Sequence, residues 1–381
     1  MYEPRKILET LNYIPPEILS AQDYELLAPD FISQDRFAYI SGGSGHDVTL
    51  TKNQQAFAKL AFIPRVLRDV DQGSTTTELL GQRFKHPILL APVAYQTLVH
   101  PQGEQAAAYA AQATDSCIVA STLSSMTLEQ IAEKAGSERW FQLYFQPDFK
   151  DTKHLLKRAV AAGYRAIVVT LDAAIQQPSM RAQRARFTFP ADLIAANLVD
   201  QMAASRSSSA GNQSHIFQSY MQNLPSREQL QWLLENSPVP VLIKGVLHSE
   251  DALELKALGA AGIIVSNHGG RTLDGVPASL SMLPAIRSAV GDRFPLLLDS
   301  GIRSGGDIFK AIALGADAVL IGRLQVYALS VAGALGVAHM IKLLREELEL
   351  TMAMTGCATI NDIRLADLTT ESSNLSRRNE C

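Results

Sequence analysis

The sequence predicts an α/β fold in which eight parallel strands, each followed by a helix, close into a (β/α)8 barrel of the TIM type. Short apolar runs rich in β-branched residues recur eight times along the chain. Helical stretches separate these runs, and most runs begin roughly 20 to 35 residues apart, the length of one β-α-β unit. No long antiparallel hairpin signal interrupts the series, which favours a closed barrel over an open doubly wound sheet.

The eight predicted strands share one hydrophobic pattern. Each is a continuous apolar stretch rather than an alternating one, as expected for a strand buried on both faces of a parallel sheet. We expect them at Pro87–Pro92, Cys117–Ala120, Trp140–Phe145, Ala166–Leu171, Pro240–Lys244, Gly262–Val265, Pro295–Leu298 and Ala318–Gly322.

Helix signals fill the intervals between these strands. Ser249 and Ser304 stand where a helix cap is needed, and glycines such as Gly163, Gly259 and Gly315 follow the last apolar turns. Helices are therefore predicted at Gly103–Thr114, Thr127–Ala135, Asp151–Ala162, Ser249–Leu258 and Ser304–Ala313.

Two other segments belong to the same fold. Residues 1–80 are expected to form an N-terminal helical segment that plugs or flanks the barrel. The most apolar stretch, Ala328–Leu344, carries His339 and Lys342 and predicts a buried helix rather than a membrane span. An α/β barrel can use a chain of this length as one unit, so residues 1–381 are predicted to be a single domain.

One interval is much longer than the others. About 65 residues separate the fourth and fifth strands, and we expect a mobile insertion over about residues 175–236. Its segment Ala203–Ser214 is rich in serine and cannot bury enough apolar surface to offset ordering entropy. The insertion is either a tolerated surface loop or a lid, since it leaves the end of the barrel where active sites lie.

Composition excludes several classes of protein. With 47% hydrophobic and 19% charged residues, the chain has the composition of a soluble globular protein. The formal net charge of −4 argues against nucleic-acid binding. Three cysteines fit neither a disulfide framework nor a metal site, and the N-terminus lacks the pattern of a signal peptide. We therefore expect a cytoplasmic protein without a membrane partner or a metal.

Polar residues stand at the C-terminal end of every predicted strand. In a (β/α)8 barrel these ends face the active site, so together they predict one ligand-binding site. In chain order they are Ala94-Tyr95-Gln96, Ser121-Thr122, Gln142 with Tyr144, Thr170 with Asp172, Lys244, Asn267-His268-Gly-Gly-Arg271, Asp299-Ser-Gly-Ile-Arg303 and Gly322-Arg323.

The loops after the last two strands predict a phosphate site. They supply small residues for close backbone approach, together with Arg303 and Arg323. A phosphorylated cofactor is favoured over two solvated surface charges. The chain has no dinucleotide fingerprint after the first strand, no P-loop, no His-Glu-x-x-His and no Gly-x-Ser-x-Gly.

The stretch Ser266-Asn-His-Gly-Gly-Arg-Thr-Leu-Asp274 is the sharpest chemical signal. His268 can accept a proton near neutral pH, and Arg271 can hold a carboxylate in bidentate fashion. The pair suits a substrate with an acidic group and a removable proton, although such a turn can also be purely structural.

Through its motifs the chain resembles the FMN-dependent 2-hydroxy-acid oxidases and dehydrogenases, the family of glycolate oxidase and lactate oxidase. The resemblance covers Tyr39 to about Asp362. It rests on Ala91-Pro-Val-Ala, Phe141-Gln-Leu-Tyr, Lys244-Gly-Val, Ser266-Asn-His-Gly-Gly-Arg, Asp299-Ser-Gly-Ile-Arg and Ile321-Gly-Arg.

The resemblance implies FMN-dependent oxidation of an (S)-2-hydroxy acid to the 2-oxo acid, with electrons passed to O2, giving H2O2, or to another acceptor. His268 would be the base, and Asp172 would hold its other ring nitrogen. Arg271 and Tyr39 would bind the substrate carboxylate, and Tyr144 would lie near the substrate hydroxyl. Relatives commonly form tetramers, so a homotetramer is expected.

The resemblance also implies a set of FMN-binding positions. Lys244 among them would stabilise the negative charge of the reduced flavin. An unpaired lysine there would be costly to bury, which favours a bound anion beside it. The full set is Pro92, Val93, Ala94, Ser121, Gln142, Thr170, Lys244, Ser266, Asp299, Ser300, Gly301, Ile302, Arg303, Gly322 and Arg323.

The chain departs from the family pattern at a few positions. Ser179 replaces a second carboxylate-binding arginine, a loss of roughly 1.5 to 3 kcal/mol of substrate binding unless Arg181 or Arg184 compensates. Leu123 stands where relatives carry a tryptophan or a tyrosine, which would admit a larger substrate. Leucine replaces proline after Arg323, with little expected effect.

Two other functions stay open at this point. The absence of an arginine at Ser179 is compatible with a non-catalytic or altered-substrate FMN-binding barrel. Lys244 could instead serve as the Schiff-base amine of a barrel aldolase.

Overall fold

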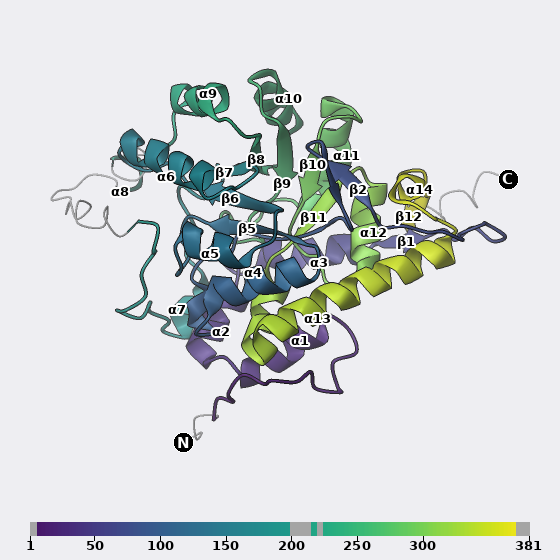
Figure 1. Cartoon of the computed structure of the whole chain (residues 1–381), viewed down its shortest axis with the longest axis horizontal. Helices are drawn as coiled ribbons and strands as arrows, with labels where there is room; N and C mark the ends of the chain where they lie inside the picture. The colour runs from purple at the N-terminus through teal and green to yellow at the C-terminus, as the bar shows by residue number, and fades with distance from the viewer. Residues whose placement is uncertain (1–5, 199–214, 219–223, 371–381) are drawn as a thin grey trace.

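The computed structural model of the chain describes residues 6–198, 215–218 and 224–370. Its centre is a closed barrel of eight parallel strands, as predicted (Figure 1). The strands are β4 (Ile88–Leu90), β5 (Cys117–Ser121), β6 (Arg139–Leu143), β7 (Ile167–Thr170), β8 (Val241–Val246), β9 (Gly262–Val265), β10 (Leu296–Leu298) and β11 (Ala318–Ile321). They pair in chain order, and β11 closes the barrel against β4.

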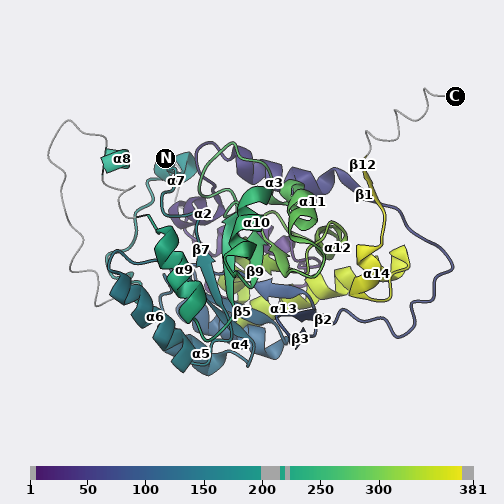
Figure 2. The ribbon, with the colours of Figure 1, turned by 90° about the horizontal axis from the view of Figure 1, so that it is seen from above.

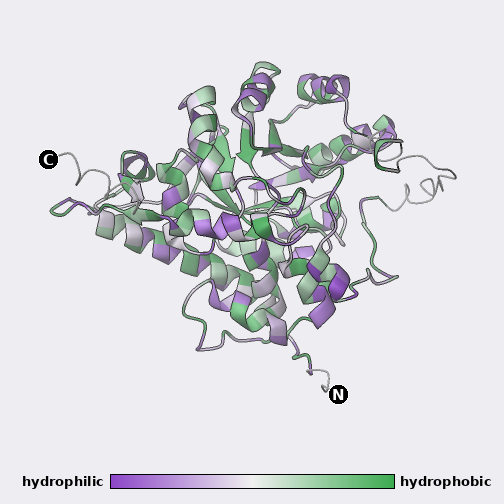
Figure 3. Ribbon diagram, turned by 180° about the vertical axis from the view of Figure 1, so that it is seen from behind, coloured by the Kyte–Doolittle hydropathy of each residue, from purple (hydrophilic) through white to green (hydrophobic). Residues whose placement is uncertain are grey.

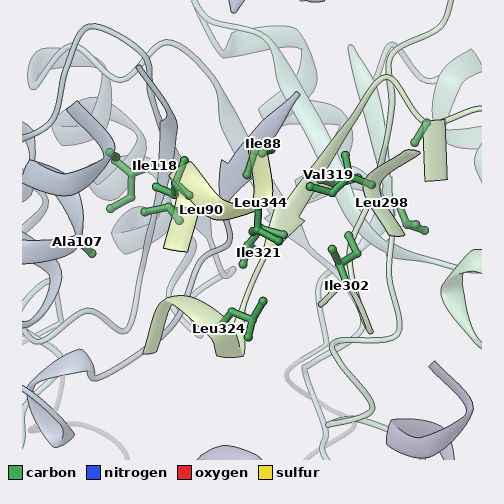
Figure 4. Packing of buried hydrophobic residues seen from close by; sticks show 14 of the residues in the cluster. Ile88, Leu90, Ala107, Ile118, Leu298, Ile302, Val319, Ile321, Leu324 and Leu344 are labelled. Atoms are coloured by element: carbon green, nitrogen blue, oxygen red, sulfur yellow. The ribbon is translucent and has the colours of Figure 1, made fainter. Parts of the chain in front are cut away.

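The continuous apolar runs are explained by two separate cores. Alternate side chains point into the barrel and out toward the helices, so that Leu89 lies in the interior cluster while Ile88 and Leu90 lie in the outer one. Figure 4 shows the outer cluster, in which strand residues lie near Ala107 and Leu344 of the helix layer. Because both faces are buried, no strand needs a polar face.

Helices surround the strands (Figure 2). Hydrophobic residues dominate the central strands, whereas the helices carry mixed faces (Figure 3). The five predicted helices are present, and α11 occupies a further interval. They are α4 (Gly103–Ala113), α5 (Leu128–Lys134), α6 (Phe149–Ala161), α10 (Ser249–Ala257), α11 (Ser279–Val290) and α12 (Gly305–Ala313).

The apolar stretch near the C-terminus lies within α13 (Arg323–Thr355), which bends at Ala332 and Gly333. By length and composition this helix could cross a membrane, but 78% of its most apolar window is buried within the protein. The N-terminal segment contributes to the bend, since Leu11 N donates to Val331 O at 2.8 Å. The predicted buried helix is therefore confirmed, although it is broken once.

The prediction of an all-helical N-terminal segment was only partly right. Residues 6–80 contain three α-helices, α1 (Asp23–Leu27), α2 (Gln34–Ser41) and α3 (Val48–Ala58), but the strands β1 (Leu60–Phe62) and β2 (Thr77–Leu79) follow them. The strand β1 pairs with β12 (Leu368–Thr370). The hairpin of β2 and β3 (Gln82–Phe84) places Leu79 and Phe84 in the interior cluster of the barrel. A hairpin therefore contributes to the interior of the barrel, while α1 and α2 flank it.

The insertion after β7 contains α7 (Met180–Arg184), α8 (His215–Gln218) and α9 (Arg227–Asn236). The predicted mobile segment Ala203–Ser214 lies outside the described residues. The first part of the insertion is packed against the barrel. There, Ala196 N donates to Ser124 O at 2.9 Å, and α7 lies beside α2 in Figures 1 and 2.

Candidate active site

A cavity of about 380 Å³, called here the mouth cavity, lies at the C-terminal ends of the barrel strands. All but four of the predicted catalytic and cofactor residues line it. They are Tyr39, Pro92, Val93, Ala94, Ser121, Tyr144, Lys244, His268, Arg271, Asp299, Ser300, Gly301, Ile302, Arg303, Gly322 and Arg323.

The remaining four predicted residues stand directly behind the lining. Asp172 bonds to His268, Ser266 bonds to Lys244, and Gln142 bonds to Ser121. Thr170 is the register partner of Lys244 across the β7–β8 pair. The structure thus brings the predicted set together around one cavity.

A histidine and an aspartate form the chemical centre of the mouth cavity. His268 Nδ1 lies 2.9 Å from Asp172 Oδ1, so Nε2 is the ring nitrogen left to exchange a proton. Burial would raise the pKa of Asp172, but the charge and hydrogen bond of His268, with the charge of Lys244, lower it below its ordinary value. The ionised Asp172 accepts a hydrogen bond from Nδ1, which leaves Nε2 as the nitrogen that can take a proton.

The turn that carries His268 is fixed by a pair of amides. His268 itself has a φ of 58°, an uncommon conformation for a residue other than glycine. Asn267 and Asn53 exchange two hydrogen bonds of 2.7 and 2.9 Å, and Asn267 Oδ1 also accepts from Gly270 N. Asn53 lies on α3, which explains why the N-terminal helices are packed at this end of the barrel. Sequence reasoning did not identify Asn53.

Arg271 is held against the C-terminal end of α2. Its Nη1 donates to Tyr39 O at 2.8 Å and to Gly42 O at 3.2 Å. Its guanidinium carbon lies 4.7 Å from the centre of the Tyr39 ring, a cation–π contact. The Phe187 ring stacks on Tyr39 with centroids 4.4 Å apart. Arg271 and Tyr39, both predicted to bind a carboxylate, are therefore positioned as one unit.

Tyr144 also lines the mouth cavity, as the resemblance implied. Its burial, with the charge of Asp172 nearby, raises the pKa of its phenol, so that it stays a neutral hydrogen-bond donor. Its backbone N–H donates to Thr122 Oγ1 at 3.2 Å, which ties the end of β6 to the end of β5.

Lys244 is buried and has an anionic partner within the chain, so its burial alone does not require a bound anion. Its Nζ lies 3.0 Å from Asp299 Oδ2 and donates to Ser266 Oγ at 2.8 Å. Burial opposes the charge, but Asp299 and Asp172 raise the pKa of Lys244 above its ordinary value. A lysine held protonated is a poor amine nucleophile, which argues against the Schiff-base aldolase.

Two of the predicted cofactor residues each carry a buried polar side-chain atom that lacks a partner among the described residues. Among the residues that the structure describes, neither Gln142 Nε2 nor Thr170 Oγ1 has a hydrogen-bond partner. Buried polar groups are seldom left in this state, because each costs roughly 1 to 3 kcal/mol. A planar cofactor with polar ring edges would satisfy both atoms, and the residues present therefore fit a flavin.

Arg323 and Gly322 could hold the phosphate group of such a cofactor. Arg323 is buried, and its Nε, Nη1 and Nη2 donate to carbonyl oxygens of Ile40, Gly269 and Gly42 at 3.0, 2.9 and 2.8 Å. Within the described part of the chain no carboxylate pairs with it, and burial lowers its pKa to about 10. Space for an approaching group is open above Gly322. A phosphate would supply the missing negative charge.

Arg303 already has a partner on α1. Its Nε donates to Glu25 Oε2 at 2.6 Å, and Nη2 donates to Oε1 at 3.2 Å. The loop before it is set by Ser300, whose Oγ donates to Asp299 Oδ1 and accepts from Gly269 N. These contacts join the loop after β10 to the histidine turn.

The structure shows whether Arg181 or Arg184 compensates for the serine at position 179. Its side chain caps α7 by accepting from Ala182 N at 3.3 Å. Arg181 is bound to Asp47 at 2.6 Å, and neither Arg181 nor Arg184 lines the mouth cavity. Neither of these two arginines therefore replaces the missing clamp beside Arg271.

Several lining residues were not assigned a role from the sequence. Tyr95 and Gln96 belong to a strand end that the barrel pattern had singled out, whereas Leu98, Val99 and Val326 come from flanking helices. Gln176 and Phe189 come from the insertion, and Phe189 lies 5.5 Å from Tyr95 between ring centroids. No sequence signal placed these insertion residues at the cavity. Their position supports the lid interpretation over the surface loop.

A parallel barrel with this mouth belongs to the class of oxidoreductases that bind a phosphorylated flavin. The model of the FMN-dependent dehydrogenase family matches residues 28–370. The chain belongs to this family, and FMN is its cofactor.

Named relatives agree with the family. The chain is 58% identical over 356 residues to an L-lactate oxidase of Alicycliphilus denitrificans, covering 93% of this chain and 98% of that one. It is 37% identical over 366 residues to glycolate oxidase 1 of Zea mays, covering 94% and 98%. A solved mandelate oxidase with (S)-2-phenylpropionate superposes with a TM-score of 0.84 at 38% identity, covering 92% and 98%. A non-catalytic barrel is not favoured by these relatives.

Proposed function

We propose that the protein oxidises a short (S)-2-hydroxy acid, L-lactate being the first candidate, to the 2-oxo acid and passes the electrons to O2, giving H2O2. One observation carries the proposal. The His268–Asp172 pair and the Arg271–Tyr39 unit line or adjoin the same mouth cavity, so that a base and a carboxylate clamp serve one bound molecule. The similarity to proteins named lactate, glycolate and mandelate oxidases supports the reaction and the acceptor.

The proposed roles follow from the contacts of each side chain. Arg271 and the Tyr39 hydroxyl hold the substrate carboxylate, and Tyr144 donates to the substrate hydroxyl oxygen. His268 Nε2 takes the hydroxyl proton, and Asp172 stabilises the resulting imidazolium through Nδ1. FMN, when bound, would accept the α hydrogen together with the two electrons of its C–H bond.

Residues around the cofactor site contribute charge and position. Lys244 is held protonated by Asp299 and stabilises negative charge near it. Gln142, Thr170 and Ser121 supply polar contacts at the strand ends, while Arg303 and Arg323 bind the phosphate. Pro92, Val93 and Ala94 form the wall of the mouth cavity that follows β4.

The side chain of the substrate would contact an apolar wall. Leu123, Tyr95 and Phe189 line the mouth cavity together with the catalytic residues. Leucine at 123 leaves room for more than a methyl group, so we expect activity on hydroxy acids with longer aliphatic chains as well. With Ser179 in place of an arginine, weaker binding of small hydroxy acids is expected.

An anaerobic panel of 2-hydroxy acids tests this function. The visible absorbance of the flavin should fall on mixing with L-lactate or a longer (S)-2-hydroxy acid, and readmitted O2 should restore it with formation of H2O2. Flavin that no member of the panel reduces would overturn the proposed reaction. Reduced flavin that reoxidises only with an artificial acceptor would overturn the proposed oxidase activity.

We further propose that the protein is a cytoplasmic homotetramer with one domain and no membrane or nucleic-acid partner. The cysteine usage supports the cytoplasmic location, and the net charge of −4 supports the absence of a nucleic-acid partner. The burial of α13 supports the absence of a membrane partner. The family match over residues 28–370 supports a single domain. Light scattering of the holoprotein should give four times 41.4 kDa, and a monomeric mass would refute the tetramer.

A further inference from the structure

We propose that Gly245 is a positioning residue for the reaction, because only a residue without a side chain at this place lets Asp172 reach His268. The inference rests on the proposed function, in which His268 is the base. Gly245 lies on β8 directly after Lys244, at a point where the pairing of β8 with β9 shifts register between Lys244 and Val246. Irregularities of this kind are common beside active sites, where they redirect side chains.

The backbone of Gly245 is packed against the Asp172 side chain. A Cβ atom at residue 245 would lie 2.5 Å from Asp172 Cγ, 2.6 Å from Asp172 Cβ and 2.9 Å from Asp172 Oδ1. Non-bonded carbon atoms are normally about 3.5 to 4.0 Å apart. All three contacts belong to Asp172, so any side chain at this position must displace that aspartate.

Asp172 has little else to hold it in place. Its Oδ1 bonds to His268 Nδ1 at 2.9 Å, and its Oδ2 is buried without a hydrogen-bond partner among the described residues. The charged and titratable groups around the carboxylate are His268, Lys244 and Tyr144. The Gly245 backbone therefore limits the position of the carboxylate on one side, and His268 limits it on the other.

Displacement of Asp172 would be transmitted to the imidazole. The backbone of His268 is fixed independently, since His268 N donates to Ser266 Oγ at 3.0 Å. Among the described residues, the hydrogen bond to Asp172 is the only one that the imidazole ring makes, so the ring orientation depends on it. A shift of about 1 Å in a catalytic group can cost on the order of 10²-fold in rate. Gly245 thus acts on the reaction through Asp172 without touching the substrate.

The chain offers a matched control for the substitution. Gly259 has a φ of 102°, nearly the 100° of Gly245, but a Cβ atom there meets nothing within 4 Å. Gly245→Ala and Gly259→Ala therefore impose similar backbone strain. Only the first brings a methyl group against Asp172.

The test compares both variants with the unaltered holoenzyme by anaerobic stopped-flow reduction with the best hydroxy acid of the panel. Gly245→Ala should lower the limiting reduction rate by about 10²-fold, with KM and FMN content little changed, whereas Gly259→Ala should react at the unaltered rate. A crystal structure of Gly245→Ala should show Asp172 Oδ1 moved beyond hydrogen-bond distance of His268 Nδ1.

The Asp172→Gly background separates this route from an effect on neighbouring Lys244. It removes the three atoms nearest to the new methyl group, so Gly245→Ala should cause no further large loss of rate there. If Gly245→Ala alone fails to fold, the Gly245→Ala/Asp172→Gly double variant should fold, with a Tm below that of Asp172→Gly by only as much as Gly259→Ala lowers the Tm of the unaltered protein.

Three results would overturn the proposal. They are equal rates for Gly245→Ala and Gly259→Ala, a further large loss in the Asp172→Gly background, and a double variant that does not fold when Asp172→Gly does. Failure of the proposed function looks different, because the unaltered protein would then not be reduced at all. In that case the Asp172–His268 distance in the crystal structure of Gly245→Ala still decides the geometric claim.

Discussion

Arg271 lies over the ring of Tyr39, with 4.7 Å between its guanidinium carbon and the ring centre. Phe187 stacks on the same ring at 4.4 Å, and two groups this close cannot share one face of it. Tyr39 is therefore enclosed between an arginine from the barrel and a phenylalanine from the insertion. The insertion thus stabilises the carboxylate clamp formed by Arg271 and Tyr39.

Phe187→Ala should weaken substrate binding. Loss of an aromatic pair removes about 1 kcal/mol beyond the buried area, so KM for the hydroxy acid should rise about fivefold while the limiting reduction rate changes little. Steady-state kinetics of Phe187→Ala and of the unaltered enzyme would measure the change in KM. Phe187→Tyr retains the ring and should behave like the unaltered enzyme. An unchanged KM for Phe187→Ala would mean that the stack does not support the clamp.

Ser179→Arg should restore part of the missing clamp. A charged hydrogen-bond pair contributes about 1.5 to 3 kcal/mol, so KM for L-lactate should fall at least about tenfold. The substitution also removes the cap of α7, which contributes about 1 kcal/mol, so Tm should fall by about 1 °C. Ser179→Ala is the control, with the same loss of Tm and no change in KM. Equal KM values for Ser179→Arg and Ser179→Ala would contradict the prediction.

Arg323→Met should weaken FMN more than riboflavin. The guanidinium is buried without an anionic partner among the described residues, and a phosphate would supply one. Losing that contact should raise the Kd of FMN by about ten- to 150-fold, as measured by flavin fluorescence on the apoprotein. Riboflavin lacks the phosphate and serves as the internal control. A comparable loss for both flavins would show that Arg323 only holds the carbonyls of Ile40, Gly42 and Gly269.

Acid should remove the stabilisation that Asp172 provides. Its pKa is lowered in the folded protein, so the ionised form favours folding at every pH above the unfolded value of about 3.9. The advantage of the unaltered protein over Asp172→Asn should therefore be constant near neutrality and shrink as pH falls below about 4. Denaturant unfolding at a series of pH values measures the difference. A difference that grows toward acid pH would contradict the assigned direction.

Much of the barrel could be predicted because each strand is buried on both faces. A run such as Ile88–Leu90 has no polar alternative, and the regular spacing of eight such runs leaves few other topologies. The hairpin of β2 and β3 was missed because its strands have three residues each and include polar ones. Only tertiary packing shows that Leu79 and Phe84 reach the interior of the barrel.

The candidate site, too, could be predicted from the sequence only in part. His268, Arg271 and Lys244 stand at strand ends, where the barrel itself determines their position. Contacts between residues far apart in the sequence could not be predicted. The Lys244–Asp299 ion pair joins β8 to the loop after β10, and nothing in the local sequence marks it. Phe189 reaches the mouth cavity through the path of the insertion, which composition does not specify.

Reduction of the bound flavin by L-lactate without oxygen tests the central claim most directly, when the unaltered protein is compared with His268→Ala. If His268 is the base, His268→Ala should keep the FMN spectrum and be reduced about 10³-fold more slowly or not at all. The unaltered protein should bleach fully on the same addition. A His268→Ala protein that bleaches within tenfold of the unaltered rate would contradict the account.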